Sequence, residues 1–390
     1  MKILFLSENY FPNVSGVPVV VKYLAEGLLT LGHSVSVATQ EYEDCLLLEN
    51  INGVDVYRFR IHSNLFHHYK GDTGSYIKFV KSFGADVIII ELAQCITTDL
   101  ALPILKDLSG KIIFHSHGLA GLEIPFFAIQ SDIKHTLGTT YNWINSQIYY
   151  HLTFRKACKY FATTLCLSEI DNSLPYFMKN AKDTRILDNA ADNMFFDEEY
   201  CSHDVLYKYV KLENNRYMMS CANYLYIKDQ ISMINQYYLS ESSKSYSLVC
   251  IGMQANDYYR ECMEVVEMNE KKYGHRDVHL LYGVSRNDIP CILNKASLYL
   301  VTSRVERYSI SLIETMSQGV PFISTNVGNA RLLPGGRTVD DVSELGATID
   351  CLLNDKVAYR EYSIKGKEFA YNNCRVDVAV NRLNNIITSI

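Results

Sequence analysis

The chain has 390 residues, of which 48% are hydrophobic and 21% are charged, and its formal net charge is −6. This length exceeds what one ordinary hydrophobic core serves and suits two domains, and the composition excludes wholesale disorder. Because the balance is acidic and no run of lysine or arginine occurs, nucleic acid is excluded as the expected partner.

The N-terminal segment is expected to form a first strand and not a targeting sequence. Its apolar run is short and meets Glu8 early, and no stretch approaches the roughly 18 apolar residues that span a bilayer. The 11 cysteines show no CxxC pair and no cysteine–histidine metal spacing. We interpret them as buried, reduced thiols, which favours a cytoplasmic protein.

Short apolar runs alternate with amphipathic segments through the first half of the chain. A strand is predicted at 2–7, followed by a turn with Pro12 and Gly16 and a helix whose apolar residues follow the 3.6-residue period up to Gly32. Further strands are expected at 34–39, 54–60, 86–92, 111–115, 163–167 and 184–187. Strands separated by helices are typical of βαβ units in a parallel sheet.

A second series of the same kind follows a polar stretch at 192–216, whose first part we interpret as a connection between domains. Its strands are expected at 217–221, 247–252, 278–282, 298–302 and 321–324. The sequence therefore predicts an α/β protein with two doubly wound, Rossmann-like domains. Ligands of such sheets bind at the carboxyl ends of the strands, so catalytic and binding residues are expected in the loops that follow the strands.

The most informative loop follows the predicted strand at 298–302. It carries Glu306, and a helix is expected to begin near Ser309, a favourable N-cap residue, with Glu314 about one and a half turns in. The free amides at the helix start, around Ile310 and Ser311, suit a diphosphate, and the two carboxylates suit the hydroxyls of a sugar and a ribose. Two glutamates in isolation are more often solvated residues on a helix face.

This block resembles the glutamate-x7-glutamate signature of the retaining GT-B glycosyltransferases, the family-4 or group-1 type. Further segments resemble other motifs of that family: 11–17 its first glycine loop, 114–118 its histidine strand end, 167–169 and 189–192 its later N-domain motifs, and 327–329 its glycine turn. The resemblance covers nearly the whole chain. It implies a GT-B fold with an N-terminal domain at 1–195, a nucleotide-sugar domain at 196–373, a C-terminal helix at about 374–390 packed on the first domain, and a cleft between the domains.

The resemblance also implies roles for individual residues. Glu306 would contact hydroxyls of the transferred sugar, Glu314 would bind the ribose, and Lys228 would offset charge on the leaving diphosphate. Gly16 would let the backbone approach the diphosphate closely, because glycine has no Cβ. His117 would lie near the 6-hydroxyl of the sugar and the reaction centre, with His115 as a supporting or structural residue.

One position departs from the family pattern. Asn223 stands where the family has an arginine that grips the diphosphate, and asparagine lacks both the charge and the bidentate fork. Either Arg304 or Arg307 substitutes, or phosphate stabilisation is weaker, or the protein is a degenerate transferase that binds a nucleotide sugar or a partner enzyme. Ala190, where glycine is usual, is a milder change. A dinucleotide-dependent oxidoreductase is disfavoured because G-x-G-x-x-G spacing is missing near Gly16.

The expected activity is that of a metal-independent hexosyltransferase without a cofactor, with UDP as the expected nucleotide of its donor. No Asp-x-Asp pattern or other metal-ligand cluster is found in the sequence. The expected acceptor is a glycan or a lipid-linked glycan of surface polysaccharide or glycoconjugate synthesis. The number of subunits is left open.

Two segments are candidates for the acceptor side. One is an aromatic and basic stretch that either lies against an anionic membrane, as a peripheral contact, or packs within its domain; it comprises Ile124, Phe126, Phe127, Tyr141, Trp143, Tyr149, Tyr150, Phe154, Arg155, Lys156, Lys159, Tyr160 and Phe161. The other is a cationic group for a phosphorylated or lipid-linked acceptor, made of Arg58, Arg60, His62, His67, His68 and Lys70.

Overall fold

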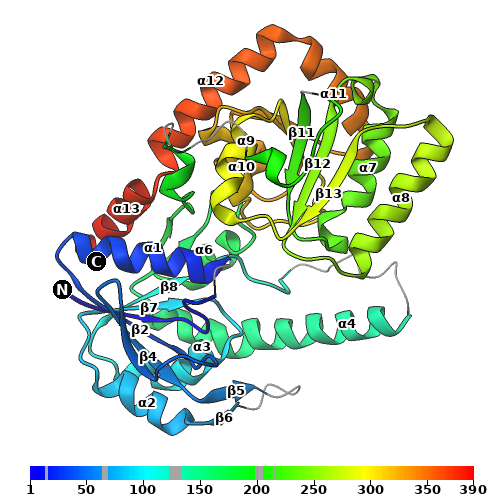
Figure 1. The fold of residues 1–390 in the computed structure, drawn as a ribbon. Coiled ribbons are helices and arrows are strands. Elements are labelled where there is room, and N and C mark those ends of the chain that lie inside the picture. Colours follow the sequence, from blue (N-terminus) through cyan, green and yellow to red (C-terminus); the bar gives the residue numbers. More distant parts are fainter. Residues whose placement is uncertain (14–15, 64–68, 123–132, 198–199, 201–204, 215) are drawn as a thin grey trace. The chain divides into compact units, whose positions relative to one another are not determined.

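The computed structural model describes residues 1–390 except 14–15, 64–68, 123–132, 198–199, 201–204 and 215, and for residues 133–137 it describes the backbone only. The chain divides into two compact units (Figure 1): unit 1 is Met1–Asn189 with Val376–Ile390, and unit 2 is Ala190–Arg375. The division falls at residue 189, a few residues before the boundary expected from the sequence, so the short turn Asn193–Phe195 belongs to unit 2.

Unit 1 contains an eight-stranded sheet with the order β10-β9-β8-β7-β1-β2-β4-β3. Every neighbouring pair is parallel except β3 with β4. The strands are β1 Lys2–Leu6, β2 Ser34–Gln40, β3 Leu48–Ile51, β4 Val54–Phe59, β7 Val87–Glu91, β8 Lys111–His115, β9 Thr163–Cys166 and β10 Thr184–Ile186. The central strands are buried on both faces, which is why they are continuous apolar runs in the sequence.

Two features of unit 1 were not predicted. One is the antiparallel strand β3, which is half exposed and lacks a clear apolar alternation. The other is a separate antiparallel ribbon of β5 Ile61–Ser63 and β6 Tyr69–Gly71. Such short, exposed strands carry too few apolar residues for a periodic signal.

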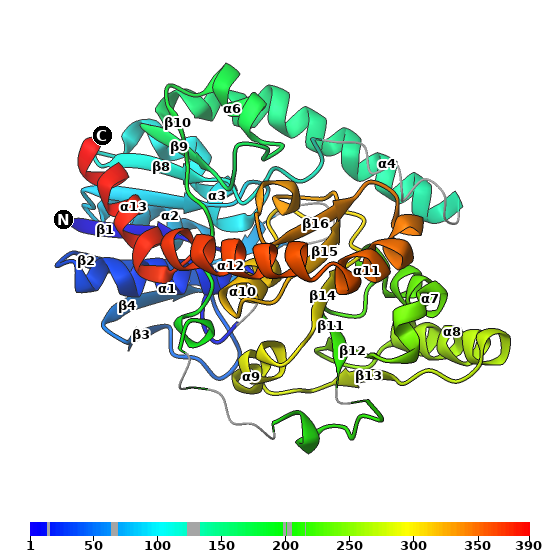
Figure 2. The same ribbon diagram turned by 90° about the horizontal axis from the view of Figure 1, so that it is seen from above.

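The helices of unit 1 include one from the C-terminal end of the chain. They are α1 Val17–Thr30, α2 Thr73–Ser82, α3 Ile96–Ala101, α4 Ile133–Ile148, α5 Arg155–Ala157, α6 Leu174–Asn180 and α13 Val376–Ser389. Helix α13 packs on α1, and both views show them side by side (Figures 1 and 2). The contact is close at Gly27, where a Cβ would lie 2.3 Å from a methyl carbon of Val380.

Unit 2 contains a six-stranded, fully parallel sheet with the order β13-β12-β11-β14-β15-β16 (Figure 2). Its strands are β11 Tyr217–Cys221, β12 Ser247–Gly252, β13 Val278–Tyr282, β14 Leu298–Val301, β15 Phe322–Thr325 and β16 Gly336–Val339. Its helices are α7 Gln230–Leu239, α8 Asp257–Tyr273, α9 Ile289–Asn294, α10 Ile310–Ser317, α11 Leu345–Asn354 and α12 Lys356–Asn373. The strand order reverses between β11 and β14, so their carboxyl ends form the switch point where such sheets bind ligands.

Consecutive residues of the unit 2 strands point into two separate hydrophobic cores. Met219 and Phe322 belong to the core on one face, and Met218 and Ile323 belong to the core on the other, as the period-2 alternation of a strand requires. The prediction of two doubly wound parallel-sheet domains is confirmed. The ten described cysteines are all free thiols, and seven of them are buried. No helix in the described ranges combines the length and the apolar character needed to cross a membrane.

Candidate functional site

Glu306 of unit 2 lies in the loop between β14 and α10 and forms an ion pair. Its Oε1 accepts hydrogen bonds from Nζ of Lys228 at 2.5 Å and from Oγ of Ser303 at 2.7 Å. Lys228 comes from the turn between β11 and α7, so each strand of the switch point contributes one partner. The two charged side chains are 24% and 14% exposed. They therefore form a partly solvent-exposed ion pair at the carboxyl edge of the sheet.

The turn after β15 supports this loop. Gly328 has φ +53°, and a Cβ there would lie 3.1 Å from Cβ of Glu306 and 3.2 Å from its carbonyl oxygen. The side-chain oxygen of Asn329 accepts a hydrogen bond from the backbone N–H of Ser309 at 2.8 Å. Only glycine satisfies both the positive φ and the close approach, so the turn fixes the position of Glu306.

Helix α10 begins at Ile310, with Ser309 at the N-cap position. The helix start and the N-cap residue lie where the sequence predicts them, but the Ser309 side chain forms no capping hydrogen bond. The hydroxyl of Ser309 lies 3.2 Å from that of Ser311, and among the described residues it caps no amide of the helix. The first amides of α10 thus have no side-chain cap, which leaves the positive end of the helix dipole suited to an anion.

Glu314, in the second turn of α10, is buried and pairs with Arg286. The guanidinium donates to both carboxylate oxygens, with Nη1 at 3.4 Å from Oε2, and it lies 4.7 Å from the ring centre of Phe195. Burial raises the pKa of Glu314, and Arg286 offsets part of that rise. Burial lowers the pKa of Arg286, but Glu314 outweighs this effect and raises it. The Arg286 side chain is 52% exposed, so one edge is free to meet a ligand.

Arg286 was missed in the sequence analysis. It lies in the loop after β13, and a single arginine in a polar loop gives no periodic or motif signal. Only its place after a predicted strand could have marked it, because the carboxyl ends of parallel strands meet at one edge.

The position of the missing family arginine is exposed. Asn223 accepts a hydrogen bond from the backbone N–H of Met253 at 3.3 Å. Arg304, one of the proposed substitutes, bonds Asp229 at 3.1 Å and lies 4.2 Å from the ring centre of Tyr226. It therefore holds the turn that carries Lys228. Arg307, the other proposed substitute, lies between Glu306 and the start of α10 and is half buried.

Gly16 of unit 1 stands at the N-cap of α1 and has φ +53°, a conformation that glycine adopts readily. No described atom lies within 4 Å of the position a Cβ would take. The backbone conformation, and not crowding, therefore requires the glycine. Val14 and Ser15 of the same motif lie outside the described residues.

His117 follows β8 and belongs to a buried cluster with Glu91 and His115. Nε2 of His117 lies 2.6 Å and Nδ1 of His115 lies 3.0 Å from the same oxygen, Oε2 of Glu91. Glu91 ends β7 and His115 ends β8, and the two residues are direct partners in the sheet register. The imidazole ring centres are 3.9 Å apart. Burial would raise the pKa of Glu91, but the two histidines lower it to about 2; burial also lowers the pKa of His117 to about 4.

This cluster corrects the expectation that the chain has no metal-ligand cluster. One ligand atom from each of Glu91, His115 and His117 lies within 4.8 Å of the others. The sequence pattern concealed the cluster because Glu91 lies on a neighbouring strand, and the strand register brings it to the two histidines.

The aromatic and basic stretch is partly core and partly surface. Tyr150, Phe154 and Phe161 are buried. A second set of side chains from the same stretch is exposed to solvent: Tyr141, Ile144, Ile148, Leu152, Arg155, Lys156, Lys159 and Tyr160. Ile124, Phe126 and Phe127 lie outside the described residues. Packing within the domain is therefore confirmed for the buried side chains, and the membrane contact stays a prediction for the exposed ones.

In the second cationic group predicted from the sequence, Arg58 is not available to an acceptor, whereas Arg60, His62 and Lys70 are exposed. Arg58 is fully buried and pairs with Glu49, and it donates to the carbonyl oxygen of Phe11 at 2.9 Å. Arg60 pairs with Glu41 at 3.2 Å. His67 and His68 lie outside the described residues. Arg58 therefore has a structural role, because a buried guanidinium needs a paired carboxylate.

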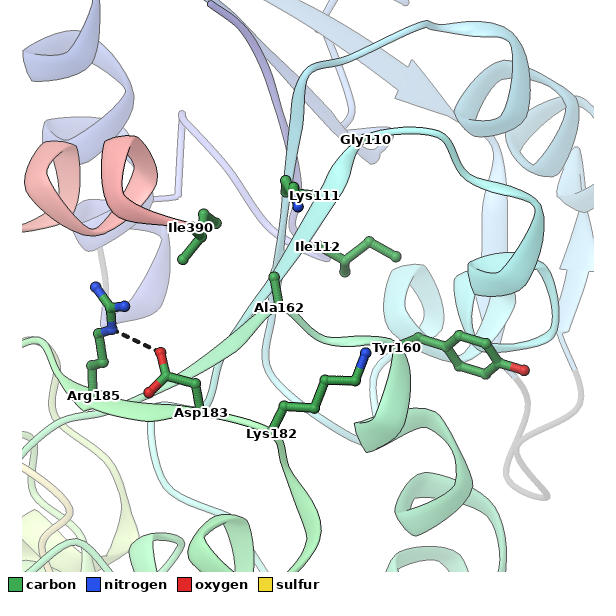
Figure 3. Close-up of a pocket in the computed structure, with 9 residues that line it drawn as sticks. All are labelled: Gly110, Lys111, Ile112, Tyr160, Ala162, Lys182, Asp183, Arg185 and Ile390. Carbon is green, nitrogen blue, oxygen red and sulfur yellow. Dashed lines mark hydrogen bonds and ion pairs between the residues drawn. The ribbon is translucent and has the colours of Figure 1, made fainter.

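A cavity of about 460 Å³ lies at the opposite edge of the unit 1 sheet, beside the starts of β8, β9 and β10 (Figure 3). Lys111, Lys182 and Arg185 line it, and Arg185 pairs with Asp183 at 2.7 Å. The strands of this region are parallel, so the cavity is on the edge away from His115 and His117. It is therefore separate from the candidate site.

Two family models match the chain. The model described as Glycosyltransferase Family 4 matches residues 14–170, and the model described as Glycosyl transferases group 1 matches residues 221–355. A curated protein of Methanocaldococcus jannaschii, described as an uncharacterized glycosyltransferase, is 49% identical over 61 residues, a span of 15% of each protein.

Solved structures share the fold over the full length. Sucrose-phosphate synthase from Thermosynechococcus elongatus has a TM-score of 0.75 at 14% identity, with 100% of this chain and 98% of that chain covered. HepE from Anabaena, solved with UDP and glucose, has a TM-score of 0.69 at 15% identity, with both chains covered fully at 100%.

Proposed function

Because the chain belongs to the group-1, family-4 glycosyltransferases of the GT-B fold, we propose that it transfers a hexose from a nucleoside-diphosphate sugar with retention of the anomeric configuration. The proposal rests on two ion pairs at the switch point of unit 2. Glu306 pairs with Lys228, and Glu314 pairs with Arg286. UDP is the proposed nucleotide, supported by HepE, a structure of the same fold that was solved with UDP-glucose.

The Lys228–Glu306 ion pair can bind both the diphosphate and the sugar of the donor substrate. When a diphosphate binds, Lys228 can turn from Glu306 to a phosphate oxygen, which frees Glu306 to accept hydrogen bonds from sugar hydroxyls. The uncapped amides of α10 supply further donors for the diphosphate. Both contributions grow as negative charge develops on the leaving group, so they stabilise the transition state more than the ground state. The acceptor hydroxyl attacks on the face that the diphosphate leaves, and the departing phosphate oxygen takes its proton.

We assign to Arg286 the charge that Asn223 does not supply. Its guanidinium already forms an ion pair with Glu314, the proposed ribose-binding residue. The N–H groups on its exposed edge can donate hydrogen bonds to a phosphate. Arg304 is held by Asp229 and Tyr226, which argues against it as the substitute. Donor binding without metal ions then rests on Lys228, Arg286 and helix dipoles.

A transfer assay tests the proposed function. The purified protein is incubated with UDP-glucose and related donors and with glycan acceptors, and the anomeric configuration of the product is read by NMR. Retention is expected, and inversion would exclude this mechanism. A thermal-shift screen of UDP, GDP and ADP identifies the base, because a ligand at 100 times its dissociation constant adds about 2.7 kcal/mol of stability. The UDP shift is expected to persist in EDTA and to be lost in Glu314→Ala.

The degenerate alternative rests on Asn223 and predicts a different outcome. A protein of that kind binds UDP but transfers no sugar, and Asn223→Arg gains activity. In our proposal the wild-type chain is active, and Asn223→Arg changes the rate by less than about tenfold because Arg286 already supplies the charge.

The exposed face from Tyr141 to Tyr160 supports a lipid-linked acceptor and peripheral contact with an anionic membrane. Tyr141, Ile144, Ile148 and Leu152 are 46–61% exposed and follow helical spacing along α4 and the turn after it. From residue 133 to residue 168 the sequence has no aspartate or glutamate, in a chain whose net charge is −6. An apolar stripe that ends in basic residues fits a surface of anionic lipid.

Co-sedimentation with vesicles tests the membrane contact. Binding to vesicles with anionic lipid is expected, with weaker binding to neutral vesicles and loss in an Ile144→Ser, Ile148→Ser variant. A matched variant at exposed apolar residues of unit 2, Met263→Ser with Met268→Ser, should bind as wild type does. Equal binding of both variants would argue that this face has another role.

A further inference from the structure

The end of β7 and β8 in unit 1 buries negative charge without a lysine or arginine to balance it. The Glu91 side chain is 0% exposed, and Asp171 is 6% exposed. In the described part of the chain, no lysine or arginine forms an ion pair with either carboxylate. A buried carboxylate without a counter-charge costs several kcal/mol, so the arrangement calls for a cation.

The two carboxylates belong to one local structure. The hydroxyl of Ser116, the residue between the two histidines, donates to the hydroxyl of Ser173 at 2.8 Å. That hydroxyl donates to Asp171 at 2.7 Å, and Asp171 also accepts from the backbone N–H groups of Leu167 and Ser173, each at 2.8 Å. Asp171 is thereby linked through Ser173 to Ser116, the residue between the two histidines, and both of its oxygens are already bonded.

The polar atoms of the cluster itself are incompletely paired. Oε1 of Glu91 and both ring nitrogens of His115 are buried, and among the described residues they form no hydrogen bond of acceptable geometry. Buried polar atoms are nearly always bonded, and each one left unpaired costs roughly 1–3 kcal/mol. Three such atoms on two adjacent side chains indicate that a bonding partner belongs between them.

We propose that Glu91, His115 and His117 bind a divalent first-row transition-metal ion of the Zn²⁺ type. Two imidazoles and one carboxylate form a common ligand set for such ions, and they leave one coordination position for water or a substrate oxygen. The ligand atoms are a carboxylate oxygen of Glu91, Nδ1 of His115 and Nε2 of His117. The carboxylates of Glu91 and Asp171 together balance the charge of the ion.

The site is independent of the metal-free diphosphate site proposed for unit 2. It is built from unit 1 residues alone, and metal binding is measured without donor or acceptor. The two tests are therefore distinguishable: sugar transfer is measured whether or not zinc binds, and an inactive protein can still bind the ion.

The test is direct measurement of metal in the full chain. The protein carries Cys351→Ser, which removes the exposed thiol, and is stripped with EDTA and titrated with ZnCl₂ by calorimetry, with bound zinc counted by mass spectrometry. One ion per chain is expected. Glu91→Gln and His115→Asn should each weaken binding by at least about 100-fold, whereas His151→Asn, at an exposed histidine, should leave it unchanged.

Cobalt substitution gives a test that does not depend on whether the variants fold, because it is made on a protein that keeps all three proposed ligands. The Co²⁺ spectrum should show visible bands of a nitrogen- and oxygen-ligated ion and no thiolate charge-transfer band. A thiolate band, or zinc binding equal in the Glu91→Gln variant and its parent, would overturn the proposal. The imidazoles themselves would then carry the counter-charge of Glu91.

Discussion

The carboxyl edges of the two sheets handle charge in opposite ways. In unit 2, Lys228 and Arg286 pair with Glu306 and Glu314, and the cations keep 24% and 52% of their side chains exposed. In unit 1, Glu91 is completely buried, and its ion-pair partners among the described residues are the imidazoles of His115 and His117. Partly exposed ion pairs can exchange one partner for a ligand, whereas a closed cluster holds one fixed arrangement. The same doubly wound architecture thus provides an exchangeable edge and a rigid edge.

The largest effect is expected at the exchangeable edge. Lys228→Met should lower kcat by roughly 10²–10³-fold, the usual loss when one electrostatic donor to a developing charge is removed. Stability should change little, because the lysine is partly exposed. Steady-state kinetics with UDP-glucose measure the loss, and Lys244→Met, at an exposed lysine of unit 2, is the matched control. A loss under tenfold would show that Lys228 does not face the diphosphate.

Arg286→Met should weaken UDP binding by about 10–100-fold and destabilise the fold by about 1–3 kcal/mol, since Glu314 is then buried without a partner. The double variant Arg286→Met, Glu314→Gln should recover the stability but not the affinity. Urea denaturation and calorimetry separate the two quantities. If affinity returns together with stability, Arg286 acts only on the fold.

A smaller effect is expected from Gly328→Ala. The positive φ costs about 1–2 kcal/mol of stability, and the new Cβ displaces Glu306, so the KM for the donor should rise several-fold. Gly274→Ala is the control, because Gly274 has φ +83° at the end of α8, where its nearest potential contact is 4.0 Å away. It should leave KM unchanged, although alanine is also disfavoured at the φ +83° and ψ 170° of Gly274. Equal KM values in both variants would contradict the supporting role of the turn.

The smallest effect concerns pH. Burial raises the pKa of Glu314, so the folded state holds a proton more tightly than the unfolded state does. The stability that this provides is present below the ordinary glutamate pKa and is lost as pH rises through the raised value. The wild type should therefore lose stability relative to Glu314→Gln as the pH rises above the ordinary glutamate pKa of about 4.3. Urea denaturation as a function of pH measures this difference in stability, and Glu267→Gln, at an exposed residue of α8, is the control. A wild type that gains stability relative to Glu314→Gln as the pH rises would contradict the prediction.

Much of the fold could be predicted from the sequence, because parallel strands buried on both faces are apolar runs bounded by helices. The strands 111–115, 217–221, 247–252 and 278–282 were predicted with the observed bounds. The missed strands β3, β5, β6 and β16 have only three or four residues each, too few for a periodic signal. What a linear pattern conceals is pairing across elements: Arg286 with Glu314, Glu91 with the two histidines, and Arg58 with Glu49. Register and burial decide these contacts, and neither is local in sequence.

The chain crosses between its units twice, at 189–190 and 375–376, and the crossings are adjacent, since the N–H of Ala191 donates to the carbonyl oxygen of Cys374 at 2.9 Å. This connectivity sets an order of events during synthesis. The sheet of unit 1 leaves the ribosome before unit 2, but α13, which packs on α1, is translated after unit 2. At about 5–20 residues per second, the roughly 200 intervening residues take about 10–40 s. Throughout that time the nascent first unit exposes the apolar face of α1, while the whole of unit 2 can fold, so the unit that is made first is completed last.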